Sequence, residues 1–281
     1  MLAGKPQMRK KYELKTNDQI RKMRVAGLLT AKALENVQAA IRPGVTTLEL
    51  DQIAEKTIRD GGGRPNFQLV PGYYHTICAS INSEVVHGIP SNKVLEAGDL
   101  ISIDCGAEVD GWNGDSAFSM VVPGLDNDVT KQRQLQSDVC EGSLWAGIAA
   151  LAKAKRLNEV GVAIEHHIAQ RGKWGILEQY VGHGIGRSMH EDPAVFNYAV
   201  RDAGPKVEPG LCVAIEPMIT SGDQKTFIHE DDWTVVTKDN GDGAHWEHSV
   251  AVHSKGIWVL TAVDGGVEGL KPFGITPISL D

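Results

Sequence analysis

The spacing of apolar residues predicts two helices at the start of the chain. Between the capping sequence 16–18 and the Pro-Gly pair at 43–44, apolar residues recur every three or four positions, as on the buried face of a helix. A second run with this spacing begins at Thr46 or Thr47 and ends at the glycines 61–63. We therefore expect two helices before the first strand.

The pattern then changes to the short apolar runs that are typical of strands. Strands are expected at 76–81, 100–105 and 117–122, and again around 179–182, 212–216, 234–236 and 246–253. Two further helices are expected between these groups, across roughly 126–154 and 158–171. This order predicts an α+β fold.

Two segments of the chain resemble each other. Residues 93–104 and 206–216 each end in an apolar strand whose last residue is a carboxylate, and a His-Gly-Ile triplet precedes each, at His87 and at His183. Chance similarity between two buried strands is the alternative, but two matches in the same order argue against it. We interpret them as a duplicated α+β unit with halves of about 16–155 and 156–270, whose sheets pack together.

The amino-acid composition and net charge limit the classes of protein to which this chain can belong. The content of 42% apolar and 23% charged residues is that of a globular protein. The net charge of −8 gives no support for direct nucleic-acid binding. No apolar run approaches the ~18–20 residues that span a membrane, and the start lacks the apolar core of a secretory signal. The four cysteines show no CxxC spacing, and three of them lie in apolar, strand-like runs, which favours reduced, buried thiols there. We expect a cytoplasmic protein.

Two features concern the outside of the molecule. Residues 1–15 are basic and lack apolar periodicity, so a mobile N-terminal tail is expected, with docking on an acidic surface as the alternative. The remaining chain, 16–281, is expected to form a single domain. It shows neither a heptad seam nor a long unpaired apolar strand, which favours a monomer.

Two aspartates can be paired from hairpin geometry alone. Asp110-Gly111 is a two-residue turn sequence, and the register that follows from it places Asp104 opposite Ala117. Asp115 is then on the same face, diagonal to Asp104 at ~7–8 Å. Neither strand carries a basic residue to pair with these carboxylates. They can therefore converge on cations.

Glu216 and Glu247 also lie in apolar runs, where an unpaired carboxylate is costly to bury. His183 and His190 flank a glycine-rich loop that can expose both rings, and His87 lies where a strand meets a loop. Carboxylates with one imidazole suit Mn(II), Fe(II), Co(II) or Zn(II). Two such ions ~3.5–4 Å apart would activate a water.

The other histidines and motifs receive no role. His166 and His167 are expected on a helix surface, and four more have no comparable context: His75, His229, His245 and His253. The HExxH, GxSxG, phosphate-loop and GxGxxG signatures are absent, which excludes the usual zincin, serine hydrolase and nucleotide-binding classes.

From about Leu14 to about Val263 the chain resembles the type I methionine aminopeptidases, a family of metallopeptidases with the pita-bread fold. The motifs that carry this resemblance surround each candidate ligand. They are Ile101–Gly106 with Asp115, Gly182–Gly186 followed by Met189–Pro193, Ala214–Pro217, and Trp246–Ser249. Residues 82–90 also resemble the loop that holds a substrate-contacting histidine in the family.

The resemblance implies a role for each motif residue. Five residues would bind two divalent ions (Co, Mn, Fe or Zn): Asp104, Asp115, His183, Glu216 and Glu247. Glu216 would also be the general base, His190 would hydrogen-bond the scissile carbonyl, and His87 would contact the leaving amide. The methionine pocket would include Tyr73, Cys78, Met189 and Trp233.

This sequence departs from the family pattern at two places. Met189 stands where the family often has an aromatic residue, and the loop before His87 lacks the cysteine that is common there. The second departure leaves open whether the auxiliary monovalent cation of the family is present.

The implied function is removal of the initiator methionine from nascent proteins and peptides, with preference for a small second residue. A transient contact between the basic tail and the ribosome is left open. One alternative is a proline-specific aminopeptidase or dipeptidase of the same fold, but such enzymes have an extra N-terminal domain and only about 80 residues precede the first strand here. Another alternative is a noncatalytic binding protein with the pita-bread fold. The presence of every type of metal ligand argues against it. The gap between Glu216 and Glu247 leaves no room for the helical insertion of the type II enzymes.

Overall fold

The computed structural model describes residues 12–280, and most of the expected basic tail lies outside this range. The part that is described is not a mobile tail. The Lys15 side chain is buried and forms an ion pair with Glu191. Its backbone N–H donates to the carbonyl of Gly210 at 2.7 Å. The prediction of a tail up to residue 15 was therefore wrong at its end, because the Lys15 ammonium has a carboxylate partner inside the fold.

The four long helices that the apolar spacing predicts are confirmed. They are α1 (Asn17–Ala40), α2 (Thr47–Asp60), α3 (Asp128–Leu151) and α4 (Glu159–Ala169). Short helical turns complete the set: α5 (Val267–Leu270), η1 (Phe67–Leu69) and η2 (Lys271–Phe273). Both α1 and α2 begin with a capping box, on Thr16 and Thr46, in which a Gln or Glu side chain returns the hydrogen bond. None of the helices in residues 12–280 is long and apolar enough to cross a membrane.

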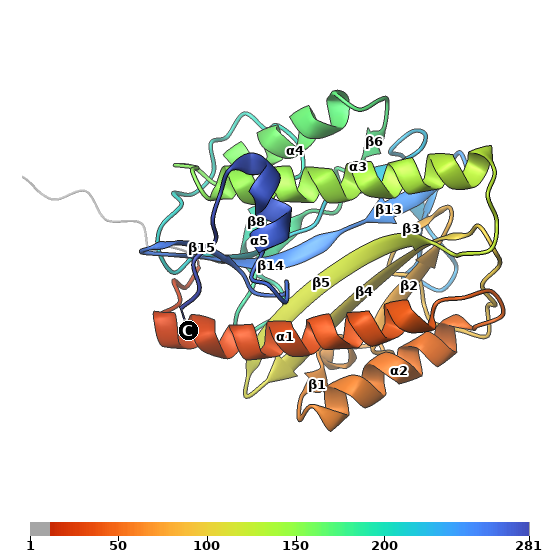
Figure 1. The fold of residues 1–281 in the computed structure, drawn as a ribbon, viewed down its shortest axis with the longest axis horizontal. Helices are drawn as coiled ribbons and strands as arrows, with labels where there is room; N and C mark the ends of the chain where they lie inside the picture. The colour runs from red at the N-terminus through yellow and green to blue at the C-terminus, as the bar shows by residue number, and fades with distance from the viewer. Residues whose placement is uncertain (1–11, 281) are drawn as a thin grey trace, which may run out of the picture.

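A nine-stranded antiparallel sheet runs through both halves of the chain (Figure 1). Its strands, in spatial order, are β1 (Arg64–Pro65), β4 (Leu100–Val109), β5 (Trp112–Val121), β14 (Glu247–His253), β9 (Cys212–Ile215), β7 (Gly182–Gly184) and β8 (Glu191–Val195), with β2 (Ile77–Ile81) on β4 and β15 (Gly256–Val259) on β14.

Two three-stranded sheets flank it. One contains β13 (Gly243–His245), β10 (Met218–Thr220) and β6 (Gly175–Ile176), and the other β11 (Thr226–Ile228), β12 (Val235–Thr237) and β3 (Glu84–Val86). The strand expected at 179–182 begins three residues later, as β7, because its partners on β8 and β9 set its limits.

The predicted hairpin register is confirmed. Asp110 and Gly111 form the turn between β4 and β5 with φ values of 51° and 76°, in the left-handed region that this turn requires. Asp104 pairs with Ala117, and Asp115 pairs with Gly106, two residues along from Asp104.

Helices cover one face of the large sheet. On β4, Ile103 and Cys105 belong to a buried cluster with residues of α1 and α2. On β9, Val213 and Ile215 belong to a second cluster with residues of α3 and α4. Figure 1 shows the two helix pairs on either side of the sheet's midline. Residues that alternate with these core positions point away from the helices, so the opposite face is free to form a site.

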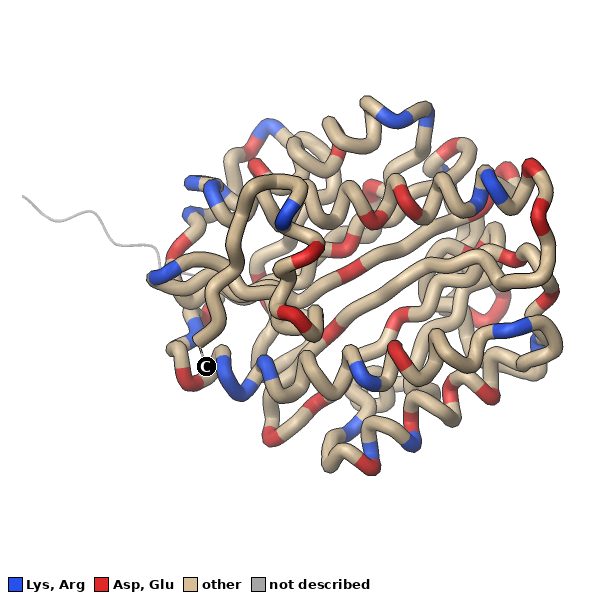
Figure 2. Tube along the Cα trace, in the orientation of Figure 1, with Lys and Arg blue, Asp and Glu red and all other residues tan. Residues whose placement is uncertain are grey.

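The structure shows where the cysteines and the charged side chains lie. All four cysteines are buried free thiols, including the three expected to be so. Figure 2 shows acidic positions along the central strands, whereas most Lys and Arg lie on helices and outer loops. Some acids on the strands have basic partners, such as Glu108 with Arg64 of β1. No ion pair with Lys or Arg involves Asp104, Asp115 or Glu247 in the described part of the chain.

Candidate metal centre

The five predicted metal ligands lie on one face of the large sheet. Asp104 on β4 and Glu247 on β14 both pair with Ala117 of β5, so these three residues form a row across the sheet. Paired residues share a face, and so do residues two apart along a strand. Asp115, two residues before Ala117, therefore lies on that face as well.

The row continues into the second half of the sheet. Ser249, two residues after Glu247, pairs with Ala214 of β9, which in turn pairs with His183 of β7. Glu216 follows Ala214 by two residues and lies just beyond the end of β9. The register of five strands thus places all five side chains on the face opposite the helices.

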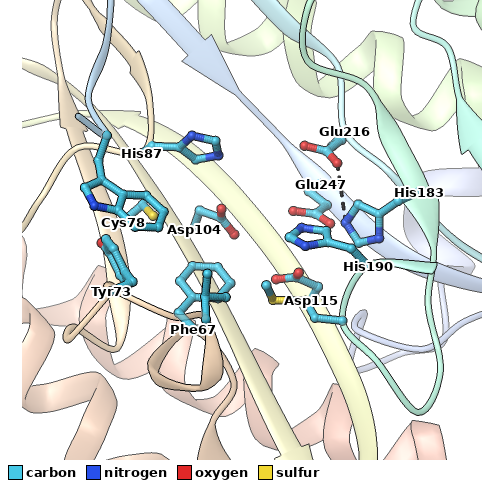
Figure 3. Close-up of a pocket in the computed structure, with 13 residues that line it drawn as sticks. Phe67, Tyr73, Cys78, His87, Asp104, Asp115, His183, His190, Glu216 and Glu247 are labelled. Carbon is cyan, nitrogen blue, oxygen red and sulfur yellow. Dashed lines mark ion pairs between the residues drawn. The ribbon is translucent and has the colours of Figure 1, made fainter. Parts of the chain in front are cut away.

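These side chains line a single cavity (Figure 3). Figure 3 shows the carboxylates with His183 and His190 at one end and the rings of Tyr73 and Phe67 at the other. Every site residue expected from the sequence is in the lining, together with Phe67 and Val70, which were not expected: Tyr73, Cys78, His87, Asp104, Asp115, His183, Met189, His190, Glu216, Trp233 and Glu247.

The four carboxylates are held together without a basic side chain. Burial raises the pKa of Asp104 to about 7 and that of Glu216 to about 8. Burial, and next the neighbouring carboxylates, raise the pKa values of Asp115 and Glu247 well above the usual range. Three buried oxygens of these carboxylates have no hydrogen-bond partner: Oδ1 of Asp104, Oδ1 of Asp115 and Oε1 of Glu247. Such orphaned acceptors fit divalent cations.

His183 has the orientation of a metal ligand. Its Nδ1 lies 2.9 Å from the carbonyl oxygen of Gly184, which can only accept, so Nδ1 carries the proton. The lone pair of Nε2 then faces Oε1 of Glu216 at 3.5 Å. Burial lowers the pKa of His183 to about 4, which keeps the ring neutral. His183, Asp115 and Glu247 each offer one atom to a common centre, all within 4.8 Å of one another.

His245 belongs to the same cluster, although the sequence analysis gave it no role. Its Nε2 lies 3.6 Å from Oε2 of Glu216 and 3.9 Å from Oε2 of Glu247, and its side chain is 2% exposed. Burial lowers its pKa. The one signal in the sequence was its position two residues before Glu247, which in an extended chain places both side chains on the same face.

Two further imidazoles border the cavity. His87 adopts a left-handed conformation (φ 60°) just after β3, and its ring packs edge-on against Tyr180 at 5.4 Å. The ring of His190 lies 4.4 Å from that of His183. Burial lowers the pKa of both, to about 4 for His87. Each neutral ring therefore has one N–H to donate and one nitrogen to accept.

The other end of the cavity is apolar. The rings of Tyr73 and Trp233 meet edge-on at 5.0 Å, and Cys78 and Phe67 are buried beside them. The Tyr73 hydroxyl donates to the carbonyl of Ile77 at 2.6 Å. Burial raises the pKa values of the Tyr73 phenol and the Cys78 thiol, so both are neutral. This end can hold an unbranched apolar side chain next to the carboxylates. Phe67 was missed because only the tertiary fold brings η1 to the cavity.

Three comparisons place this geometry among known proteins. A sequence profile of metallopeptidase family M24 matches residues 21–254. Methionine aminopeptidase 1 of Mycobacterium tuberculosis is 46% identical over 245 residues, which cover 85% of this chain and 91% of that protein.

Solved structures agree. The crystal structure of methionine aminopeptidase from Rickettsia prowazekii is 31% identical, with a TM-score of 0.84 over 89% of this chain and 99% of that one. Prolidase from Pyrococcus furiosus shares the fold at 21% identity and a TM-score of 0.67, but the match covers only 65% of that longer chain. The pita-bread fold expected from the sequence is thus confirmed.

Proposed function

Because the chain belongs to metallopeptidase family M24 and, within it, to the methionine aminopeptidases, we propose that its cavity is the site at which it removes the N-terminal methionine of peptides and newly made proteins. It is a metal-dependent aminopeptidase. The observation that carries the proposal is the row of ligands on one sheet face, which ends beside an apolar pocket of side-chain size. An ion site and a side-chain pocket next to each other are what an exopeptidase needs to hold a free amine and one residue.

The residues fit two divalent ions. Asp104, Asp115, His183, Glu216 and Glu247 would hold them, and Co, Mn, Fe and Zn all suit this donor set. When bound, such ions activate a water and polarise a carbonyl. Their binding would also neutralise the carboxylates whose buried oxygens have no partner.

Three side chains of the cavity would handle protons and charge. The carboxylate of Glu216, at the edge of β9, would accept the proton of the attacking water. The neutral imidazole of His190 would donate to the scissile carbonyl oxygen as negative charge develops on it. His87, on the opposite wall, would contact the amide of the leaving group. The lowered pKa values of both histidines support donation from neutral rings.

The apolar end would select methionine. Tyr73, Cys78 and Trp233, with Met189 beside them, offer a soft surface to an unbranched thioether. Preference for a small second residue is proposed from the similarity to the methionine aminopeptidases.

The oligomeric state, the location in the cell and contact with the ribosome are proposed from the sequence alone. We propose a monomer that acts in the cytoplasm, where new N-termini emerge. Transient contact of the basic segment that precedes Lys15 with the ribosome would bring it to them.

Turnover of three peptides tests the function. Met-Ala-Ser, Met-Lys-Ser and Ala-Pro peptides are incubated with chelator-treated protein, with and without added Mn(II) or Co(II). Cleavage of Met-Ala-Ser is expected only with metal and should exceed that of Met-Lys-Ser. Preference for Ala-Pro would instead favour the proline-specific alternative, and no cleavage of any peptide would favour the noncatalytic one.

A further inference from the structure

A buried ring nitrogen faces the metal centre from behind the glutamates. Nε2 of His245 is inaccessible and has no hydrogen-bond partner, although buried polar atoms in proteins nearly always have one. The ring does not line the open cavity. It approaches Glu216 and Glu247 from the β13 side, so an ion held between these carboxylates would be within its reach.

The backbone of His245 is fixed on both sides. Its N–H donates to Oγ of Ser119 at 2.8 Å, and the same hydroxyl donates to its carbonyl at 2.8 Å. On the other side the residue pairs with Met218 of β10. The backbone that carries the imidazole is therefore placed by the fold before any ion binds, and the 2% exposure of the side chain restricts how the ring can turn, which is how a ligand is preorganised.

The distances are those of ligands that share an ion. Separations of 3.6 and 3.9 Å are too long for hydrogen bonds. Atoms bound to one ion at about 2.0–2.2 Å lie roughly 3–4 Å apart. His183, an expected ligand, is 3.5 Å from the other oxygen of Glu216. Glu216 thus presents one carboxylate oxygen to each imidazole.

We propose that His245 is a sixth protein ligand of the metal centre, with its Nε2 bound to an ion that Glu216 and Glu247 also hold. These three residues offer one atom each within 4.8 Å of one another, separately from the group of Asp115, His183 and Glu247. Each group then contributes one imidazole and two carboxylates, with Glu247 common to both. This proposal rests on the proposed metal-dependent function, but it concerns which atoms bind the ions.

A second imidazole changes which ions the centre prefers. Nitrogen donors favour borderline ions such as Co(II), Zn(II) and Fe(II) over Mn(II) more strongly than carboxylates do. Loss of His245 should therefore weaken Co(II) binding more than Mn(II) binding. We expect at least a tenfold increase in the dissociation constant of one of two Co(II) ions.

Proton NMR of the Co(II)-loaded full-length protein tests the assignment. Each imidazole bound to Co(II) should give one strongly shifted N–H resonance in H₂O that is lost in D₂O. We expect two such resonances in the unaltered protein, one in His245→Leu and one in His183→Leu. His253→Leu, which removes another buried imidazole, on β14 and hydrogen-bonded to Ile278, is the matched control and should keep both.

The outcomes separate this proposal from the proposed function. A single shifted resonance that disappears in His183→Leu, or two that both persist in His245→Leu, would overturn it even if the peptidase is active. If His245→Leu does not fold, the spectrum of His183→Leu tests the proposal instead. The proposal requires one shifted resonance, that of His245, in this variant, and its absence would contradict the proposal. Two resonances without cleavage of any methionyl peptide would leave the ligand assignment standing and contradict the function.

Discussion

At the scale of single residues, the site is defined by acids that have no basic partner. The orphaned oxygens of Asp104 and Asp115 have no hydrogen-bond donor in the described structure, and the one arginine on that face of the neighbouring strands, Arg64 on β1, is paired with Glu108. Either protons or cations must compensate their charge. The proposed role of Glu216 as a base requires its own carboxylate to be ionised, which bound cations would favour because they offset the raised pKa.

Replacement of this base separates its two proposed roles. Glu216→Gln keeps an oxygen that can contact an ion but cannot accept a proton. We expect kcat for a Met-Ala-Ser peptide to fall by about 10²–10⁴-fold, while metal content measured by emission spectroscopy stays within a factor of two. Glu141→Gln alters a partly buried glutamate on α3, outside the cavity, and should leave kcat unchanged. Normal turnover by Glu216→Gln would remove the general-base role.

The sequence was sufficient to predict the position of some residues of the site but not of others. Asp104 and Asp115 followed from one local turn, because hairpin register is set within a dozen residues. His245 did not, because its partners come from β9 and β14 and its orientation depends on Ser119. No local pattern contains that information. The roles of the individual site residues stay predictions.

At the scale of elements, the loop that carries His190 is held in place by the start of the chain. Glu191, next to His190, pairs with the buried Lys15 and also accepts from the Ser188 N–H at 3.1 Å. The segment before α1 thereby touches the glycine-rich loop of the site. This contact was outside the reach of sequence reasoning, because it joins positions 176 residues apart.

Loss of this contact should loosen His190 without removing a ligand. Lys15→Met keeps most of the side-chain volume but leaves Glu191 partly buried and unpaired, which costs stability locally. We expect kcat/KM for Met-Ala-Ser to fall about 5–50-fold, consistent with a misplaced catalytic group, and the two-ion stoichiometry to be retained. Lys22→Met, on the exposed face of α1, is the control and should match the unaltered enzyme. Equal rates for both variants would show that the pair does not position the loop.

Long elements were predicted better than short ones. The helices α1 to α4 and the strands β4 and β5 have enough residues for their own periodicity to define them. Strands such as β10 and β13 have three residues each, and their pairing with distant partners decides where they form. The division of the chain between residues 155 and 156 stays a prediction.

At the scale of the whole molecule, the acidic centre links stability to pH and to metal. In the metal-free folded protein the pKa values of Asp104 and Glu216 are about 7 and 8, compared with 3.8 and 4.5 for the free side chains. Between about pH 4 and pH 8 the folded state then binds more protons than the unfolded state, so this contribution to stability is complete below about pH 4, decreases as pH rises and is lost above about pH 8. His87 and His183, with lowered pKa values, act in the opposite sense but only below about 6.5.

Thermal unfolding at two pH values tests this linkage. The Tm of metal-free protein should fall between pH 6.5 and pH 8.5, and the rise in Tm on adding Mn(II) should be larger at pH 8.5, where ions no longer compete with protons. Scanning calorimetry of the Asp104→Asn protein provides the comparison, since its metal-free Tm should depend less on pH. A metal-induced shift that is larger at pH 6.5 would contradict the raised pKa values.

The two halves of the large sheet meet where β5 pairs with β14, through Ala117 with Glu247 and Ser116 with His248. Two of the proposed ligands come from before this seam in the sequence and three from the later half, the last being Glu247. With the proposed ligand set, a chain that is still being translated would lack a complete metal centre until Glu247 has been made and β14 has paired with β5. A copy of the chain that ends before Glu247 is therefore expected to be inactive.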